Sequence, residues 1–331
     1  MSANNQTTVV EFFLLGFRNL HAFKFLLFSL LLLVYVVSLG GNLLIITLVL
    51  FSSLLRSPMY FFLSHLSFCD TVFTTNILPN MLQVILQEGS RLSIVGCITQ
   101  YHVFGFSATT ESFLLTVMSY DRYLAICNPL RYTAMMNSSL QVLLVSSSWF
   151  LSFVITLTSL LLICRLQFCG PNVIDHFFCD VAPLLELSCS DTSTIKIEIY
   201  VCSIPIVLFP FLFIMGSYIS IFLSILRIST TSGRQKAFST CSSHLTVVSL
   251  YYGTLFAVYV VPTSVSSLNL NKILSLLYTV VTPMFNPIVY SLRNQEIKSA
   301  FQEKTLDLSL LRCYHSVVLR SLAQSNPCSF L

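Results

Sequence analysis

Charged side chains are scarce in this chain. Asp, Glu, Lys and Arg make up 9% of its 331 residues, whereas 55% of the residues are hydrophobic. Soluble domains usually carry about 25% charged residues. This composition therefore excludes a surface that faces water throughout, and it predicts contact with lipid. Long basic runs are also absent and the net charge is only +4, which argues against a nucleic-acid-binding face.

We expect no removable signal peptide, because no basic segment or cleavage site precedes the first apolar run. The chain does have seven apolar blocks, each comparable with the ~20 residues that cross a bilayer. They cover about 25–51, 58–84, 94–126, 140–163, 196–226, 237–261 and 272–292. The second and seventh are the weakest, and the second contains His65 and Asp70. We predict an all-α membrane protein, a seven-transmembrane helix bundle over 25–292.

The odd number of spans places the termini on opposite sides of the membrane. With the N-terminus outside, the basic residues near inner helix ends are Arg56, Arg122, Arg131, Arg227, Arg234, Lys236, Arg293 and Lys298. Those on the outer side are Arg18, Lys24, Arg91, Arg165, Lys196 and Lys272. This modest excess agrees with the positive-inside rule. We therefore predict an extracellular N-terminus over 1–24, a cytoplasmic tail over 293–331, glycan on the Asn5 sequon and none on Asn137.

An acid and a base, Asp121 and Arg122, stand side by side at the end of the third apolar block. An ion pair is costly deep in hydrocarbon, so the pair should mark the point where the helix leaves the membrane. Pro129 then ends the helix. Two interpretations remain open. Arg122 either reaches the lipid headgroups with Asp121 neutralising it, or the pair is a switch that releases Arg122 to a cytoplasmic partner.

Cysteines cluster at the predicted outer side. Cys97 begins the third block, and the polar loop 165–194 holds Cys169, Cys179 and Cys189. Four cysteines allow three pairings, and the spacing does not choose among them. A bridge from Cys97 would tie the loop over the end of the bundle. Buried unpaired thiols, ordinary as small apolar residues, fit the cysteines within helices or at inner ends: Cys69, Cys127, Cys202 and Cys241.

A series of motifs, taken together and in order, resembles the olfactory receptors, which are rhodopsin-like G-protein-coupled receptors. The resemblance covers the chain from Asn5 to about Ala300. It rests on the residues Glu11–Phe17, Gly41–Asn42, Pro58–Ser64 with Asp70, Met118–Cys127, Ser217–Tyr218, Lys236–Leu245 and Pro283–Asn294. Ser119 stands where the family more often has Ala.

The resemblance implies roles for particular residues. It implies the disulfides Cys97–Cys179 and Cys169–Cys189. It implies a G-protein switch formed by Asp121, Arg122, Tyr123, Tyr218, Asn286, Pro287 and Tyr290. It also implies a polar network of Asn42, Asp70, Glu111 and Asn286. This network either holds a sodium ion, the only cofactor considered, or is held by hydrogen bonds alone with one carboxyl protonated, since neighbouring carboxylates resist joint ionisation.

The resemblance further implies an odorant pocket in the outer half of the bundle. The corresponding residues are Phe104, Gly105, Ala108, Thr109, Ser112, Cys202, Ser203, Ile206, Val207, Tyr252, Leu255, Phe256, Tyr259 and Thr279. Helical spacing places residues 104, 108 and 112 on one face. The lining is apolar with few hydroxyls, which would suit a small neutral volatile molecule. The alternative for each residue is ordinary packing between helices.

The implied function is that of an odorant receptor in the plasma membrane, which activates a stimulatory olfactory-type G protein and raises cAMP. A chemosensory role outside the nose, or impaired coupling, is the alternative. A transporter would show internal repeats, and an enzyme would need a convergent catalytic or metal-binding cluster; the sequence has neither. The tail after Ala300 is less basic than in the family, so a short helix is expected only over 294–300.

Overall fold

A computed structural model describes residues 9–17, 23–169, 171–227, 230–259 and 268–306, apart from some side chains within these ranges. Several predicted features lie outside the described parts: the Asn5 sequon, Arg18, the side chains of Lys236, Tyr259 and Arg293, and the tail beyond residue 306.

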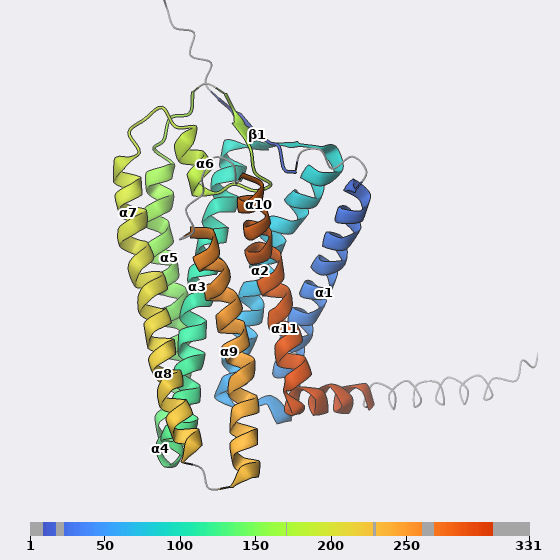
Figure 1. Cartoon of the computed structure of the whole chain (residues 1–331), viewed down its shortest axis with the longest axis vertical. Coiled ribbons are helices and arrows are strands. Elements are labelled where there is room, and N and C mark those ends of the chain that lie inside the picture. The colour runs from blue at the N-terminus through green and yellow to red at the C-terminus, as the bar shows by residue number, and fades with distance from the viewer. Residues whose placement is uncertain (1–8, 18–22, 170, 228–229, 260–267, 307–331) are drawn as a thin grey trace, which may run out of the picture.

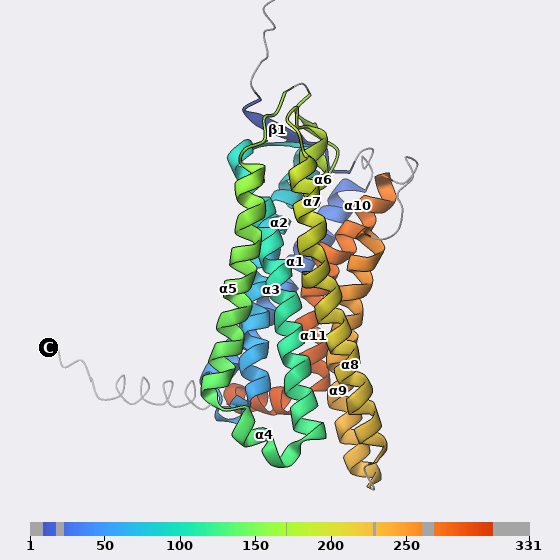
Figure 2. The same cartoon turned by 90° about the vertical axis from the view of Figure 1, so that its left-hand side faces the viewer.

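Long helices run side by side along the molecule (Figures 1 and 2). They are α1 (Lys24–Phe51), α2 (Pro58–Gln87), α3 (Ile94–Cys127), α5 (Ser138–Ile163), α7 (Ser193–Ser203) continued by α8 (Phe209–Leu226), α9 (Thr231–Tyr259), and α10 (Leu268–Leu276) continued by α11 (Thr282–Arg293). The shorter segments are η1 (Ser53–Leu55), α4 (Pro129–Met135) and α6 (Val181–Glu186). A single apolar core extends through the bundle.

Within the described residues, 4 helical segments are long and apolar enough to cross a membrane: Lys24–Phe51, Ser138–Ile163, Ser193–Leu226 and Lys272–Ser291. The other long helices, α2, α3 and α9, bury polar side chains such as Asp70, Glu111 and His244. These inward-facing groups lower the average hydropathy of a helix without placing charge against lipid. The chain is thus a mostly helical protein with membrane-spanning candidates.

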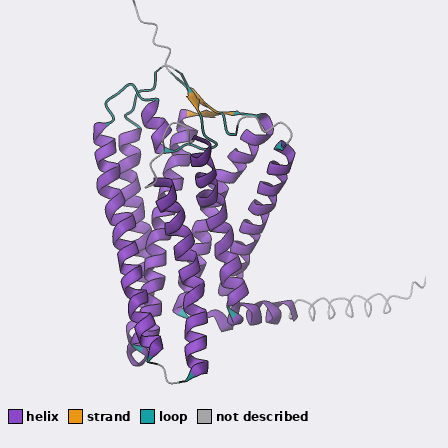
Figure 3. Ribbon diagram, in the orientation of Figure 1, coloured by secondary structure: helices purple, strands orange, loops and turns teal. Residues whose placement is uncertain are grey.

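A small sheet covers one end of the bundle (Figure 3). Strand β1 (Glu11–Leu14) pairs antiparallel with β2 (Ser90–Ser93) and parallel with β3 (Val173–Ile174), so the order is β2-β1-β3. Alternate side chains of β1, those of Phe12 and Leu14, are buried in a second apolar cluster at this end. We call this end the sheet end, and we call the opposite end, where α4 lies, the Arg122 end. The sequence analysis did not predict the sheet.

Two helices contain a widened π turn next to a proline. In the fifth long helix the turn is η2 (Ile204–Leu208), where the Phe209 N–H donates to the Ile204 carbonyl five residues back, and Pro210 follows. In the last long helix the turn is η4 (Leu277–Val281), followed by Pro283 and then Pro287. Proline has no N–H, so each proline leaves a carbonyl on the preceding turn without its helical partner. Such turns are often found at functional sites.

The tail differs from the expectation. Residues 295–306 form a helix, so it continues beyond the predicted end at Ala300. It leaves the bundle at a sharp angle at the Arg122 end (Figure 1). Ile297 and Ala300 are buried and anchor its first turns. Glu303 and Lys304 are good helix formers, and no Gly or Pro interrupts 295–306, which explains why lower basicity did not end the helix.

Candidate functional site

An aromatic cluster brings α2, α3, η4 and the loop before α6 together beneath the sheet end. The Phe104 ring centroid lies 5.5 Å from that of Phe73, 5.2 Å from that of Phe178 and 5.6 Å from that of Tyr278. Offset and edge-to-face pairs at these distances are favourable. Phe104, the first residue of the predicted pocket, therefore contacts the loop 165–194 as well as the neighbouring helices.

One hydroxyl group joins three helices of the predicted pocket. Ser112 Oγ lies 2.9 Å from Tyr252 Oη, and it donates to the Ile206 carbonyl at 2.9 Å. In an unbroken helix the Ile206 carbonyl would accept from the N–H of residue 210, but that residue is a proline. Pro210 thus provides a free acceptor within η2, and α3 supplies its donor. The three residues bring together α3, η2 and α9, as the resemblance implied.

Most of the other predicted pocket residues are at least partly buried. The Ala108 carbonyl accepts from Tyr251 Oη at 2.7 Å, which ties α3 to α9 a second time. Thr109, Leu255 and Thr279 are buried. Cys202, Ile206 and Val207 are half-buried.

Three predicted pocket residues lie apart from the bridge. Gly105 faces α5, because a Cβ atom there would lie 3.8 Å from Thr156. Phe256 is 62% exposed, whereas Leu255 beside it is buried. Ser203 is exposed, and its hydroxyl donates to the Ile199 carbonyl of its own helix. These positions were named from the resemblance; Ser203 and Phe256 expose their side chains, and Gly105 packs its backbone towards α5.

The buried carboxylates meet through one amide. Asn286 Nδ2 donates to Asp70 Oδ2 at 2.8 Å and to Glu111 Oε1 at 3.3 Å, and all three side chains are buried. Asn42 does not join them by a hydrogen bond among the described residues. It donates instead to the Pro283 carbonyl at 3.3 Å, the acceptor that Pro287 leaves free. The close approach of α1 and α11 there depends on Gly41, since a Cβ atom would lie 2.9 Å from Pro287.

At the Arg122 end the predicted ion pair is present and enclosed. Arg122 Nε donates to Asp121 Oδ2 at 2.9 Å, and the Asp121 side chain is 0% exposed. Tyr132, in α4, donates to the other oxygen of Asp121 at 2.8 Å. Burial and the neighbouring Asp121 carboxylate raise the pKa of the Tyr132 phenol, so it remains a donor. Tyr132 was not predicted as a partner of Asp121. Its position just after the helix-ending Pro129 is the one feature of the sequence that points to it.

A second contact at this end joins α8 to α9. Tyr218 Oη lies 2.6 Å from His244 Nδ1, and both residues are buried. Tyr290 of α11 is also buried, and its hydroxyl has no partner among the described residues. Tyr218 and Tyr290 were named as switch residues, whereas His244 was not given a role although it lies in a quoted motif. The arrangement places groups from α3, α4, α8, α9 and α11 at one end of the bundle.

Comparison with known proteins decides the family. A profile of the olfactory receptor family matches residues 31–307. Olfactory receptor 5G29 of Mus musculus is 51% identical over 304 residues, which are 92% of this chain and 97% of that protein. Olfactory receptor 5G3 of Homo sapiens is 47% identical over 304 residues, again 92% of this chain and 97% of the relative.

The chain belongs to the olfactory receptor family. This family consists of G-protein-coupled receptors of the membrane, whose ligands are small-molecule odorants, so the chain is a receptor and not an enzyme. The recognition of the family from the ordered motifs is confirmed.

The sheet end of the receptor is cross-linked. Disulfides join Cys97 to Cys179 and Cys169 to Cys189, with Cα–Cα distances of 5.4 and 5.9 Å, the pairs that the resemblance implied. The first ties the outer loop to α3. Gln100 supports the same contact, since its Oε1 accepts from the Cys179 N–H at 3.0 Å.

Lys272 is a buried cation at the sheet end. Its Nζ lies 2.6 Å from Asp175 Oδ1 and donates to the Gly16 carbonyl at 2.8 Å. It therefore holds α10, the outer loop and the segment after β1 together. Beside it, burial and the nearby ammonium lower the pKa of His176 to about 3, so this imidazole is neutral. Sequence analysis counted Lys272 only as an outer-side charge, because its partners are far away in the sequence.

Proposed function

We propose that this receptor binds a small, largely apolar, neutral odorant in the outer half of its bundle and activates a stimulatory olfactory-type G protein, which raises cAMP. The observation that carries the proposal is the bridge from Ser112 to Tyr252 and the Ile206 carbonyl. A pocket that orients an apolar ligand needs only a few polar groups among apolar walls. This bridge supplies the Ser112 and Tyr252 hydroxyls and the Ile206 carbonyl beside the half-buried side chains of η2.

The same bridge offers a route for transmission. Ser112 lies on α3 three turns before Arg122, and Tyr252 lies on α9, two turns after His244. A ligand that bonds to the Ile206 carbonyl or to the Tyr252 hydroxyl competes with Ser112 and changes how α9 sits against α3. A ligand shifts an equilibrium only if it binds one arrangement better, and this competition provides that difference. Release of Arg122 from Asp121 then opens the Arg122 end to the G protein.

The proposed topology crosses the membrane seven times in the plasma membrane, with the sheet end outside and the Arg122 end in the cytoplasm. Two observations support it. The disulfides stand at the sheet end, and disulfides persist in oxidising compartments. The basic side chains of Arg56, Arg131 and Arg227 are exposed at or near the other end, as the positive-inside rule requires.

We further propose that the Asp70 and Glu111 carboxylates hold a hard monovalent cation such as sodium. Oxygen atoms suit such a cation, and Asp70 Oδ1, Asn286 Oδ1 and Asn42 Oδ1 are buried acceptors without a partner among the described residues. These atoms fit the cation. A hydrogen-bonded network with one protonated carboxyl is the alternative, and sodium titration of thermal stability separates them, because only the first responds to sodium at constant ionic strength.

A cAMP reporter assay in cells, run over a broad odorant panel, tests the function. For an odorant that activates the wild type, we expect Ser112→Ala to shift the potency about 3- to 10-fold, the value of one hydrogen bond. Ser203→Ala is the matched control, because this exposed hydroxyl bonds only within its helix. Equal effects of the two substitutions would contradict the proposed pocket.

Arg122→Ala tests the coupling step separately. We expect it to abolish the odorant-driven cAMP signal while the receptor still reaches the cell surface, since the side chain serves the partner more than the core. A normal response from Arg122→Ala at the surface would leave Arg122 as a lipid contact. Absence of any cAMP response to the panel in the wild type, with another G-protein pathway responding, would contradict the stimulatory coupling.

A further inference from the structure

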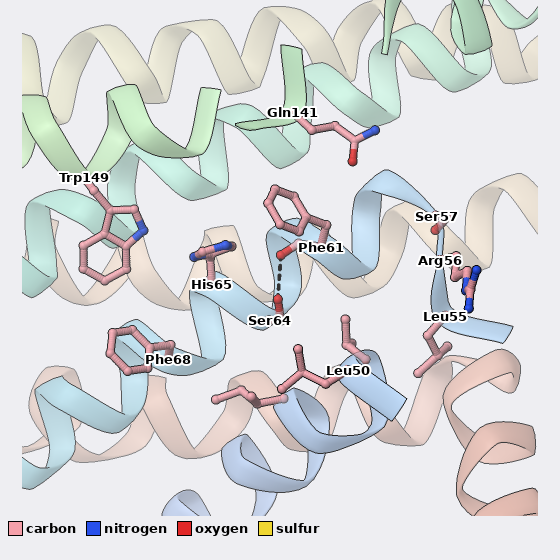
Figure 4. A pocket seen from close by; sticks show the side chains of 12 residues that line it. Leu50, Leu55, Arg56, Ser57, Phe61, Ser64, His65, Phe68, Gln141 and Trp149 are labelled. Carbon is pink, nitrogen blue, oxygen red and sulfur yellow. Dashed lines mark hydrogen bonds between the residues drawn. The ribbon is translucent and has the colours of Figure 1, made fainter. Parts of the chain in front are cut away.

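A groove of about 700 Å³ lies between α1, α2 and α5 (Figure 4). Most of its wall is apolar and includes Val49, Leu50, Phe61, Phe68 and Trp149. It is separate from the Ser112 bridge, since none of its lining residues belongs to α3, η2 or α9. Neither the odorant proposal nor the G-protein switch uses it.

The groove opens towards the bilayer. Leu50 is 70% exposed and Phe68 is 51% exposed, although both are large apolar side chains. Two of the three helices that form it, α1 and α5, are long and apolar enough to cross a membrane. Apolar side chains exposed there face hydrocarbon, so the molecules that can enter the groove from the side are lipids.

The one charged side chain of the groove lies at one end, whereas the polar residues Ser64 and His65 line its middle. Arg56 and Ser57 stand where the chain enters α2, and Gln141 lies across from Phe61 (Figure 4). Arg56 is exposed and forms no ion pair with any described residue. A guanidinium binds phosphate oxygens in a paired geometry. This end therefore suits an anionic headgroup, and the apolar wall beyond it suits a hydrocarbon chain.

The length of the groove agrees with one leaflet. Eleven residue steps separate Ser57 from Phe68 in α2, which is a rise of about 16 Å. The hydrocarbon core of a bilayer is about 30 Å thick, so this distance is close to half of it. A lipid anchored at Arg56 would extend one acyl chain past His65 to Phe68 and Trp149.

We propose that this groove binds one anionic glycerophospholipid, with its phosphate at Arg56 and one acyl chain between α1, α2 and α5. A sterol would bring a hydroxyl but no charge and would leave Arg56 unmatched. A second copy of the chain, docked symmetrically through this groove, would have to bring a carboxylate to Arg56, and none of the lining residues is Asp or Glu. A bilayer supplies the phospholipid without either difficulty.

Lipid retention on the purified full-length receptor tests the proposal. Native mass spectrometry of receptor released from membranes of phosphatidylcholine mixed with phosphatidylserine should show bound phosphatidylserine. We expect Arg56→Gln to reduce it roughly fivefold, the effect of one basic side chain at a membrane surface. Arg227→Gln is the matched control, because Arg227 is an exposed basic residue at the end of α8, away from the groove. Equal retention by both variants would overturn the site.

A second variant tests the acyl chain. Ser64 lines the groove and is partly exposed, so Ser64→Phe fills the space while leaving Arg56 in place. We expect it to displace phosphatidylserine, and we expect inorganic phosphate to leave retention in the wild type unchanged. Undiminished retention in Ser64→Phe, or displacement by inorganic phosphate, would show that only the charge of Arg56 matters and would overturn the proposal. Odorant activation is not part of either readout, so the result is independent of the proposed signalling.

Discussion

The two ends of the receptor are held together by different kinds of bond. At the sheet end, three strands, two disulfides and the buried Lys272 join segments that are distant in sequence. At the Arg122 end, the corresponding contacts are hydrogen bonds and ion pairs. They are Asp121 with Arg122 and Tyr132, Tyr218 with His244, and Tyr60 with Asn294 and Glu296.

This difference separates a fixed end from a changeable one. A disulfide contributes about 2–4 kcal/mol and does not break during signalling, whereas a hydrogen bond contributes only about 0.5–1.5 kcal/mol and is readily exchanged. Under the proposed function, the sheet end must keep the ligand-binding residues in place while the Arg122 end changes partners. The comparison predicts that lesions at the sheet end reduce folding, and that lesions at the Arg122 end change signalling.

The largest effect should follow from loss of the Cys97–Cys179 bridge. Cys97→Ser and Cys179→Ser should each destabilise the receptor by about 2–5 kcal/mol and reduce its delivery to the cell surface. The double variant should be no worse than either single one, since both remove the same bond. Surface immunostaining and thermal unfolding measure this. Additive losses would mean that the two cysteines do not pair.

Lys272→Met should have the next largest effect. It removes the ion pair with Asp175 and the bond to the Gly16 carbonyl. We expect a loss of about 1.5–3 kcal/mol, the range for a charged hydrogen bond, rather than the larger cost of a fully buried pair, because the Asp175 side chain is 33% exposed and can be hydrated. The double variant with Asp175→Asn should recover part of the thermal stability. A double variant no more stable than Lys272→Met would show that the pair is not coupled.

Mild acid should weaken the sheet end through His176. Its pKa is lowered to about 3 in the folded receptor, against about 6.5 when unfolded. The neutral form is therefore the one that the fold accepts. Its contribution is complete above the unfolded pKa and is lost as the pH falls below it, by about 2 kcal/mol at pH ~5. His176→Gln should flatten this part of the stability profile between pH ~7 and ~5, and an unchanged slope would contradict the assignment.

The smallest effect should come from Tyr132→Phe at the Arg122 end. It removes one hydrogen bond to Asp121, worth about 1 kcal/mol. We expect surface levels to stay unchanged while basal cAMP rises about fivefold, because Asp121 then holds Arg122 less firmly in place. Tyr120→Phe is the control, since Tyr120 is a partly buried tyrosine of α3 that lies outside the switch and whose hydroxyl forms no hydrogen bond with a described residue. Reduced surface delivery with unchanged basal signalling would show that this bond at the Arg122 end serves folding and not signalling.

Much of the helical architecture could be predicted from composition, because a run of apolar residues long enough to cross a bilayer has few other structures available. The ion pair at Asp121 and Arg122 was equally visible, since charges stand out in an apolar sequence. The sheet was not visible. Strand β1 has four residues, and β3 has only two, too few for an alternating pattern to distinguish a strand from an apolar loop.

The contacts within the site could not be predicted from the sequence, because the residues that bond are far apart along the chain. Lys272 and Asp175 are 97 residues apart, and Ser112 and Ile206 are 94 residues apart. No local pattern links such pairs. The sequence shows that Pro210 interrupts the helix. It does not show that Ser112 donates a hydrogen bond to the carbonyl that Pro210 leaves free. The family resemblance indicated which helices form the predicted pocket, and the structure shows which side chains and carbonyls bond to one another.

The π turn η2 also has a consequence for transferring residue numbers between receptors. Each helical residue advances the helix by about 100°, and a turn that closes over five residues instead of four holds one residue more. A regular α-helix extended back from Ser217 and Tyr218 therefore predicts the wrong direction for side chains before η2. The error is roughly one residue, which is about 100°. Ser203 stands just before the turn and faces outward. Substitutions meant to exchange ligand preference between two receptors should be aligned separately on each side of this turn.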